Sequence, residues 1–148
     1  STWMDMARDK YTNKVPLKPG AREFLVWLRQ QGIRTGIASS NGIELVETVL
    51  KAQGIQEYLE SVHTCCEVPK GKPAPDIYLL VAKTLGVKPE ECLVFEDVPM
   101  GILAGKNAGM RVCAVEDTFS ASQREEKKEL ADYYIESYDE IPRERMQP

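Results

Sequence analysis

The feature that most constrains the fold is a short apolar run that ends in two adjacent acids. Cys92-Leu-Val-Phe95 is typical of a strand buried on both faces of a parallel sheet. Glu96 and Asp97 follow it directly, and a Pro-Met-Gly turn then opens an Ala/Gly-rich helix. Because open α/β sheets bind ligands beyond the carboxyl ends of their strands, these two carboxylates are candidate ligand groups.

Two carboxylates side by side repel each other unless a cation, a proton or solvent relieves the repulsion. Oxygen ligands at a strand tip suit Mg²⁺, which takes a few carboxylates and keeps several waters or phosphate oxygens. A simpler interpretation is equally compatible with this run alone. In it, Asp97 caps the following helix and Glu96 is solvated.

Strands and helices alternate along the whole chain. Helices are expected over 1–12, 21–31, 43–53, 76–85, 101–108 and 122–131, and strands over 33–38, 61–64, 92–95, 111–115 and 133–135. The last helix has Ser122 and Glu125 in a capping-box pattern. Two prolines make 15–20 a connector. The pattern predicts an α/β fold with a doubly wound parallel sheet, in one domain.

Charge and cysteine usage narrow the classes of partner. The net charge of −4 without a basic cluster argues against nucleic acid and against an anionic membrane surface. No apolar run approaches the roughly 20 residues of a transmembrane helix. The cysteines lack zinc-site spacing and indicate free thiols of a cytoplasmic protein, and His63 is expected to be structural. The four cysteines are Cys65, Cys66, Cys92 and Cys113.

Two further strand-end loops carry candidate site residues. Ser39-Ser40-Asn41 places hydroxyl and amide groups at a helix N-terminus, an arrangement that binds phosphate through backbone N–H groups. A plain helix cap is the simpler interpretation. Lys72 lies between Gly71 and Pro73, where the stiff backbone aims its ammonium group toward an anion. Taken alone, such a lysine is usually just solvated.

Together, the three loops form a set suited to phosphoryl transfer. That chemistry needs positioning and charge neutralisation more than covalent work by the protein. The chain has no GxxxxGK[ST] loop and no GxGxxG fingerprint, which argues against nucleotide binding by either motif. Phospho-accepting signalling receivers use similar groups, but they place their acidic pair first and their lysine last. Here the order is hydroxyl, lysine, carboxylates.

These motifs resemble the haloacid dehalogenase superfamily, and within it the β-phosphoglucomutase-like phosphatases and mutases. The resemblance is carried by Ser39-Ser-Asn41, Lys72-Pro-Ala-Pro-Asp-Ile-Tyr78 and Phe95-Glu-Asp-Val-Pro-Met-Gly-Ile102, and it extends from about Leu17 to Ile135. It implies a Rossmann-like three-layer α/β/α core. It also implies a Mg²⁺-dependent phosphatase that acts on a small phosphorylated metabolite through an aspartyl-phosphate. A phosphosugar mutase and an inactive phosphate- and metal-binding module remain alternatives.

The resemblance also assigns roles to individual residues. Ser39 corresponds to the hydroxyl that binds the transferring phosphoryl group, and Ser40 and Asn41 to further substrate contacts. Lys72 corresponds to the lysine that bridges the nucleophile and the phosphoryl group. Asp97 corresponds to a Mg²⁺ ligand, and Glu96 to its partner in the metal site.

Two departures from the family pattern stand out. Val98 occupies a position where many relatives have serine. More seriously, the family's Asp-x-Asp-Gly motif, which supplies the nucleophile at the tip of the first strand, occurs nowhere in this chain. We therefore interpret residues 1–14 as the remnant of a helical cap and residues 15–148 as a core that lacks its first strand. A missing N-terminal segment of the same protein is an expected partner.

Overall fold

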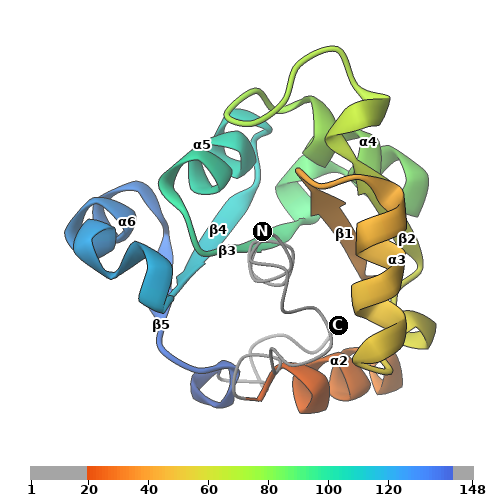
Figure 1. Cartoon of the computed structure of the whole chain (residues 1–148). Coiled ribbons are helices and arrows are strands. Elements are labelled where there is room, and N and C mark those ends of the chain that lie inside the picture. Colours follow the sequence, from red (N-terminus) through yellow and green to blue (C-terminus); the bar gives the residue numbers. More distant parts are fainter. Residues whose placement is uncertain (1–19, 142–148) are drawn as a thin grey trace.

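The structure, a computed structural model, describes residues 20–141. The helix expected over 1–12, the cap remnant and most of the 15–20 connector therefore lie outside the described residues. Helices alternate with parallel strands along the described chain (Figure 1). The expected parallel α/β class is confirmed. The strands are β1 (Gly36–Ser39), β2 (Ser61–Thr64), β3 (Leu93–Glu96), β4 (Arg111–Val115) and β5 (Tyr133–Ile135).

The helices lie close to their expected positions. They are α2 (Ala21–Gln30), α3 (Ile43–Ala52), α4 (Asp76–Leu85), α5 (Pro99–Asn107) and α6 (Arg124–Leu130), with short 3₁₀ turns η1 (Gln56–Tyr58), η2 (Cys65–Glu67), η3 (Pro89–Glu91), η4 (Thr118–Gln123) and η5 (Tyr138–Glu140). Helix α4 has the bounds that the sequence predicts, because Gly86 takes the left-handed conformation that ends a helix, with φ 71°. Among these helices, none is long and apolar enough to cross a membrane.

Three local predictions are corrected by the structure. Strand β1 begins at Gly36, later than the expected start at 33. Helix α5 begins at Pro99, since proline is well suited to the first turn of a helix. The capping box at Ser122 and Glu125 is wrong, because the chain is already in a 3₁₀ turn there and Gln123 stands at the cap without a side-chain bond.

Side chains alternate between two apolar cores on opposite faces of the strands. Ile37, Phe95 and Cys113 pack with α2 and α3 on one face. Ala38 and Val94 pack with α4 and α5 on the other. This period of two residues is what a strand buried on both sides produces. The expected three-layer α/β/α arrangement follows from it.

The sheet is divided into two parts within the described chain. Strands β1 and β2 form one parallel pair, and β3, β4 and β5 form a second parallel sheet. Between β1 and β3 lies a cavity of about 1180 Å³, lined on one side by Gly36–Ala38 and on the other by Leu93–Phe95. Residues of α2 and α4 also line this cavity, which we call the slot.

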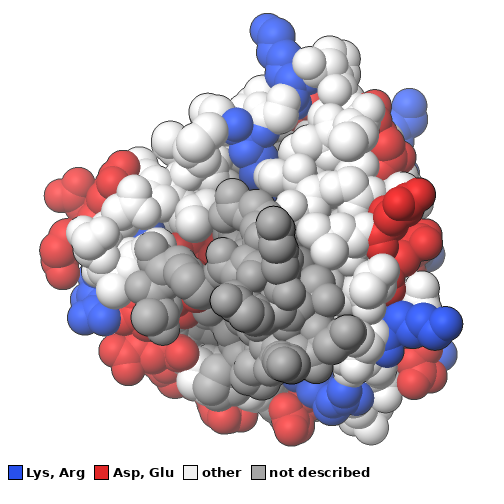
Figure 2. Space-filling model, in the orientation of Figure 1, with Lys and Arg blue, Asp and Glu red and all other residues white. Residues whose placement is uncertain are grey.

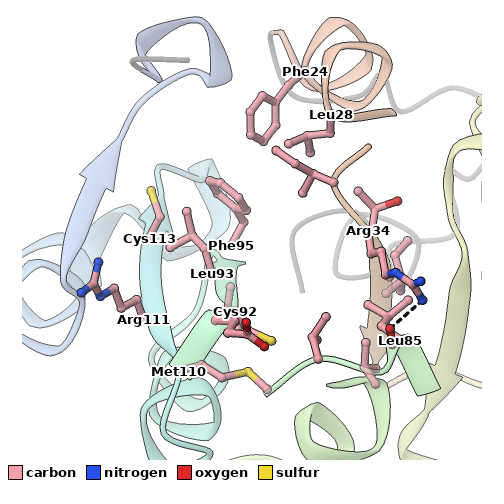
Figure 3. A pocket seen from close by; sticks show the side chains of 18 of the residues that line it. Phe24, Leu28, Arg34, Leu85, Cys92, Leu93, Phe95, Met110, Arg111 and Cys113 are labelled. Atoms are coloured by element: carbon pink, nitrogen blue, oxygen red, sulfur yellow. Dashed lines mark hydrogen bonds between the residues drawn. The ribbon is translucent and has the colours of Figure 1, made fainter. Parts of the chain in front are cut away.

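Figure 3 shows how side chains surround this slot. Phe24 and Leu28 of α2 lie at one end, and Leu93 and Phe95 of β3 lie along one side. Opposite them, Arg34 donates a hydrogen bond to the carbonyl of Leu85 over 2.8 Å. Phe24 meets the Phe95 ring edge to face, with centroids 5.4 Å apart. This aromatic contact holds α2 against the larger sheet.

On the face shown in Figure 2, acidic side chains are visible at the left, the right and the lower edge. Acidic residues lie over α6 and over α3, which carry the glutamates Glu125, Glu126 and Glu129, and Glu44 and Glu47. Basic side chains are dispersed among them on this face. The distribution accords with the net charge of −4.

Candidate active site

Lys72 joins the carboxyl ends of the two half-sheets. Its ammonium group donates to the carbonyl of Ala38 over 3.1 Å and to Glu96 Oε2 over 2.5 Å. Ala38 precedes Ser39, the last residue of β1, and Glu96 is the last residue of β3. The shared carboxyl edge that the sequence predicts for Ser39, Lys72 and the acid pair is therefore present. Both β1 and β3 therefore end beside Lys72.

Glu96 is an ionised carboxylate inside the protein. Its side chain is fully buried, and Oε2 accepts hydrogen bonds from Lys72 and from the Tyr78 hydroxyl. Burial by itself would raise the pKa of this carboxyl group. The pKa is nevertheless lowered, to about 2, and the Lys72 ammonium and the two hydrogen bonds are among the causes. The acid therefore keeps its negative charge at neutral pH.

Gly101 makes room for that carboxylate at the start of α5. A Cβ atom added there would lie 2.2 Å from the Glu96 carboxyl carbon, well inside van der Waals contact. Tyr78 and Gly101 are thus two site residues that sequence reasoning missed. Both lie inside the quoted motifs, but helix periodicity alone could not tell that they face Glu96.

The loop that carries Lys72 is tied down on two sides. Its Lys72–Pro73 peptide bond is cis, and the carbonyl of Pro73 accepts a hydrogen bond from Asn107 Nδ2 over 2.9 Å. The ammonium group lies 5.1 Å from the centroid of the Tyr78 ring. The Lys72 side chain is only 5% exposed. The prediction that this lysine is aimed rather than solvated is consistent with these contacts.

Ser39 and Asn41 form a tight turn after β1. Ser39 is buried, and its Oγ accepts a hydrogen bond from the Asn41 backbone N–H over 3.0 Å. Helix α3 begins after Gly42, which caps it without a side-chain bond. The simpler helix-cap interpretation therefore does not describe this loop. Ser40 is exposed, and Cys65 Sγ lies 3.8 Å from its hydroxyl.

Asp97 lies fully buried at the junction of β3 and α5. Val98, not Asp97, is the N-cap of α5, so the capping interpretation is wrong for this residue too. The backbone carbonyl of Asp97 accepts a hydrogen bond from Ser120 Oγ over 2.7 Å. This contact comes from the loop after β4, which the sequence did not connect with the site.

The acid pair fits the requirements of Mg²⁺. Glu96 and Asp97 supply only oxygen donors, and they are adjacent, buried and at a strand tip, where one or two protein carboxylates suffice for this ion. Within residues 20–141 there is no set of three or more His, Cys, Asp or Glu side chains placed to hold a metal. His63 bonds instead to Glu67 and Thr84, over 2.9 and 2.8 Å.

The model of the haloacid dehalogenase-like hydrolase family matches residues 6–109. A putative phosphatase, YhcW, of Bacillus subtilis is 41% identical over 98 residues, which is 66% of this chain and 44% of the relative. Hexitol phosphatase B of Escherichia coli is 32% identical over 126 residues, which is 85% and 56% of the two chains.

Solved structures give the same result for the fold. The crystal structure of a putative β-phosphoglucomutase from Thermotoga maritima superposes with a TM-score of 0.76 at 28% identity, covering 86% of this chain and 59% of that one. The chain spans about half the length of the curated relatives it matches. The family model covers well over half of the chain. The chain belongs to the haloacid dehalogenase-like hydrolases.

Proposed function

We propose that the protein catalyses Mg²⁺-dependent phosphoryl transfer, as a phosphatase of small phosphate monoesters such as sugar phosphates. The observation that carries this proposal is the position of Lys72, which holds its buried ammonium group between Ala38 and Glu96 at the carboxyl edge of both half-sheets. A fixed positive charge at such a place can neutralise a phosphoryl group. The names of the relatives, which are phosphatases, support the same class of substrate.

Each site residue has one task in this proposal. Ser39 offers its hydroxyl to the transferring phosphoryl group, and Ser40 and Asn41 contact the substrate. Lys72 neutralises the phosphoryl oxygens while it remains ion-paired with Glu96. Asp97 and Glu96 would hold the Mg²⁺ ion, which when bound offsets negative charge on the phosphate oxygens.

The nucleophile of the proposed reaction is an aspartate, and none of the motifs found in this chain supplies it. The chain contains no Asp-x-Asp-Gly motif, so the aspartyl-phosphate would form on a segment that precedes the 15–148 core. The slot between β1 and β3 supports this proposal. No strand ladder joins β1 to β3 in the described chain, and an additional strand lying between these two edges would join the two half-sheets. Its carboxyl end would then emerge beside Lys72, because β1 and β3 both end there.

The cysteines indicate the compartment in which we propose that the enzyme works. All four cysteines are free thiols, which accords with the reducing conditions of the cytoplasm. A small phosphorylated metabolite is the proposed partner, together with the segment that carries the nucleophile. A phosphosugar mutase is the second candidate, favoured by the likeness to the putative β-phosphoglucomutase.

Asp97→Asn tests the proposed function. We first measure the intact mass of the denatured sample, to learn which segments accompany this chain. Phosphate release from p-nitrophenyl phosphate and from a panel of sugar phosphates is then followed as Mg²⁺ is varied. In the protein that includes the nucleophile-bearing segment, we expect Asp97→Asn to lose the Mg²⁺-dependent turnover by at least a hundredfold, since removing one charge-stabilising group costs about that much. This chain without that segment should show no turnover. Full activity in this variant would refute the metal site, and isomerised phosphosugars without phosphate release would favour the mutase.

A further inference from the structure

Lys127 is a charged side chain that the proposed function does not use, although it is fully buried. Its ammonium group donates to the carbonyl of Val115 over 2.7 Å and to Ser120 Oγ over 3.0 Å. It also lies 5.9 Å from the centroid of the Tyr134 ring. A buried ammonium is unfavourable unless hydrogen bonds replace its water. The other charged side chains of α6 are exposed, so the burial of Lys127 needs a structural reason.

The direction of the hydrogen bonds follows from the chemistry of the three groups. An ammonium group has donors and no acceptor, so Ser120 Oγ must accept from Lys127. The hydroxyl proton of Ser120 is then directed at the carbonyl of Asp97, 2.7 Å away. Because Lys127 polarises the hydroxyl, the second hydrogen bond is strengthened. The positive charge on α6 therefore acts on the backbone of Asp97 through one serine.

We propose that Lys127 and Ser120 are positioning residues that fix Asp97 for Mg²⁺ binding. This inference rests on the proposed metal site. Asp97 stands between β3 and α5, and the N-cap of α5 is its neighbour Val98. The anchor from Ser120 holds the Asp97 peptide unit, and so sets where its carboxylate projects. Contacts of this kind behind a metal ligand change metal affinity by about 10- to 100-fold.

The test measures ion affinity rather than turnover. Tb³⁺ is added to the protein, and its luminescence is excited through Tyr78, whose hydroxyl bonds to Glu96. Mg²⁺ then displaces the Tb³⁺ and gives the Mg²⁺ affinity. We expect Lys127→Met and Ser120→Ala each to weaken Mg²⁺ binding about tenfold. The double variant should be no weaker than Lys127→Met alone, because both changes break one chain of hydrogen bonds.

Two controls separate positioning from a general loss of structure. Lys128→Met makes the same substitution one residue along α6, at an exposed position, and should leave the Mg²⁺ affinity unchanged. Ser120→Thr keeps the hydroxyl and should restore the affinity that Ser120→Ala loses. Circular dichroism tests whether each variant is folded. If Lys127→Met does not fold, the Mg²⁺ affinity of Ser120→Ala alone tests the inference.

The outcomes are distinct. Weaker binding in both variants, with Lys128→Met unchanged, supports the inference. Wild-type affinity in a folded Ser120→Ala variant overturns it while leaving the proposed function intact. A wild-type protein that binds neither Tb³⁺ nor Mg²⁺ overturns the proposed metal site, and this inference with it.

Discussion

Glu96→Gln should expose the electrostatic role of the buried acid. The pKa of Glu96 is about 2 in the folded protein, against 4.5 for an ordinary glutamate. One pKa unit corresponds to about 1.4 kcal/mol, so the ionised carboxylate contributes about 3 kcal/mol to stability at neutral pH. Glu96→Gln removes that contribution and leaves the 5% exposed Lys72 without this counterion. A loss of about 3 kcal/mol is also what breaking a buried ion pair typically causes.

The pH dependence of this loss has a definite sign. The folded pKa lies below the unfolded one, so the contribution is complete well above pH 4.5 and is lost as the pH falls toward 2. At pH 3.5 a substantial part of this contribution should already be lost in the wild type. Glu96→Gln has no carboxyl group to titrate at this position. The difference in stability between wild type and variant should therefore narrow measurably between pH 7 and pH 3.5.

Urea unfolding at pH 7, 5 and 3.5 measures these differences, with the denaturant slope checked for constancy. The control is Lys106→Met, which breaks the ion pair with Asp132, in which the Lys106 and Asp132 side chains are 39% and 31% exposed. An exposed pair of this kind contributes less than about 1 kcal/mol. If Glu96→Gln cost no more than the control, or if its cost did not change with pH, the buried-charge argument would be refuted.

Two more predictions concern packing and thiol chemistry. Gly101→Ala should displace the Glu96 carboxyl group, which a Cβ would approach to 2.2 Å, and destabilise the protein by about 1–3 kcal/mol in the same urea assay. Gly42→Ala, where a Cβ meets nothing within 4 Å, is the control, and equal losses would contradict the steric argument. Burial raises the pKa of the Cys113 thiol to about 12, so a thiol reagent added to the native protein at pH 8 should modify exposed Cys66 and not Cys113. Peptide mass mapping identifies the modified cysteines, and rapid modification of Cys113 would contradict its burial.

Much of the fold could be predicted because local signals and the fold agree. Helix α4 is bracketed by Pro75 and Gly86, and both residues act locally. The apolar run before Glu96 predicts a buried strand wherever its neighbours lie. The same local reasoning placed Ser39, Lys72 and the acid pair at strand ends, and the structure brings Lys72 and Glu96 into contact.

What could not be predicted depends on contacts between distant segments. Lys127 stands in the run Arg-Glu-Glu-Lys-Lys-Glu, which is typical of a solvated helix face, yet the structure buries it against Val115 and Ser120. The capping-box pattern at Ser122 failed because the 3₁₀ turn before it had already fixed the backbone. The separation of β1 from β3 could not be predicted either, because the apolar sequence of each strand is typical of an interior strand.

The division of the sheet has a consequence for how the protein folds. Each strand pairing in the described chain joins two strands that follow one another in the sequence: Gly36 with Ser61, Leu93 with Arg111, and Cys113 with Tyr133. Chain closure over such short separations is rapid compared with pairing between remote segments. Each half can therefore assemble around its own helix connections before the two meet, and Lys72 completes the site only when they do.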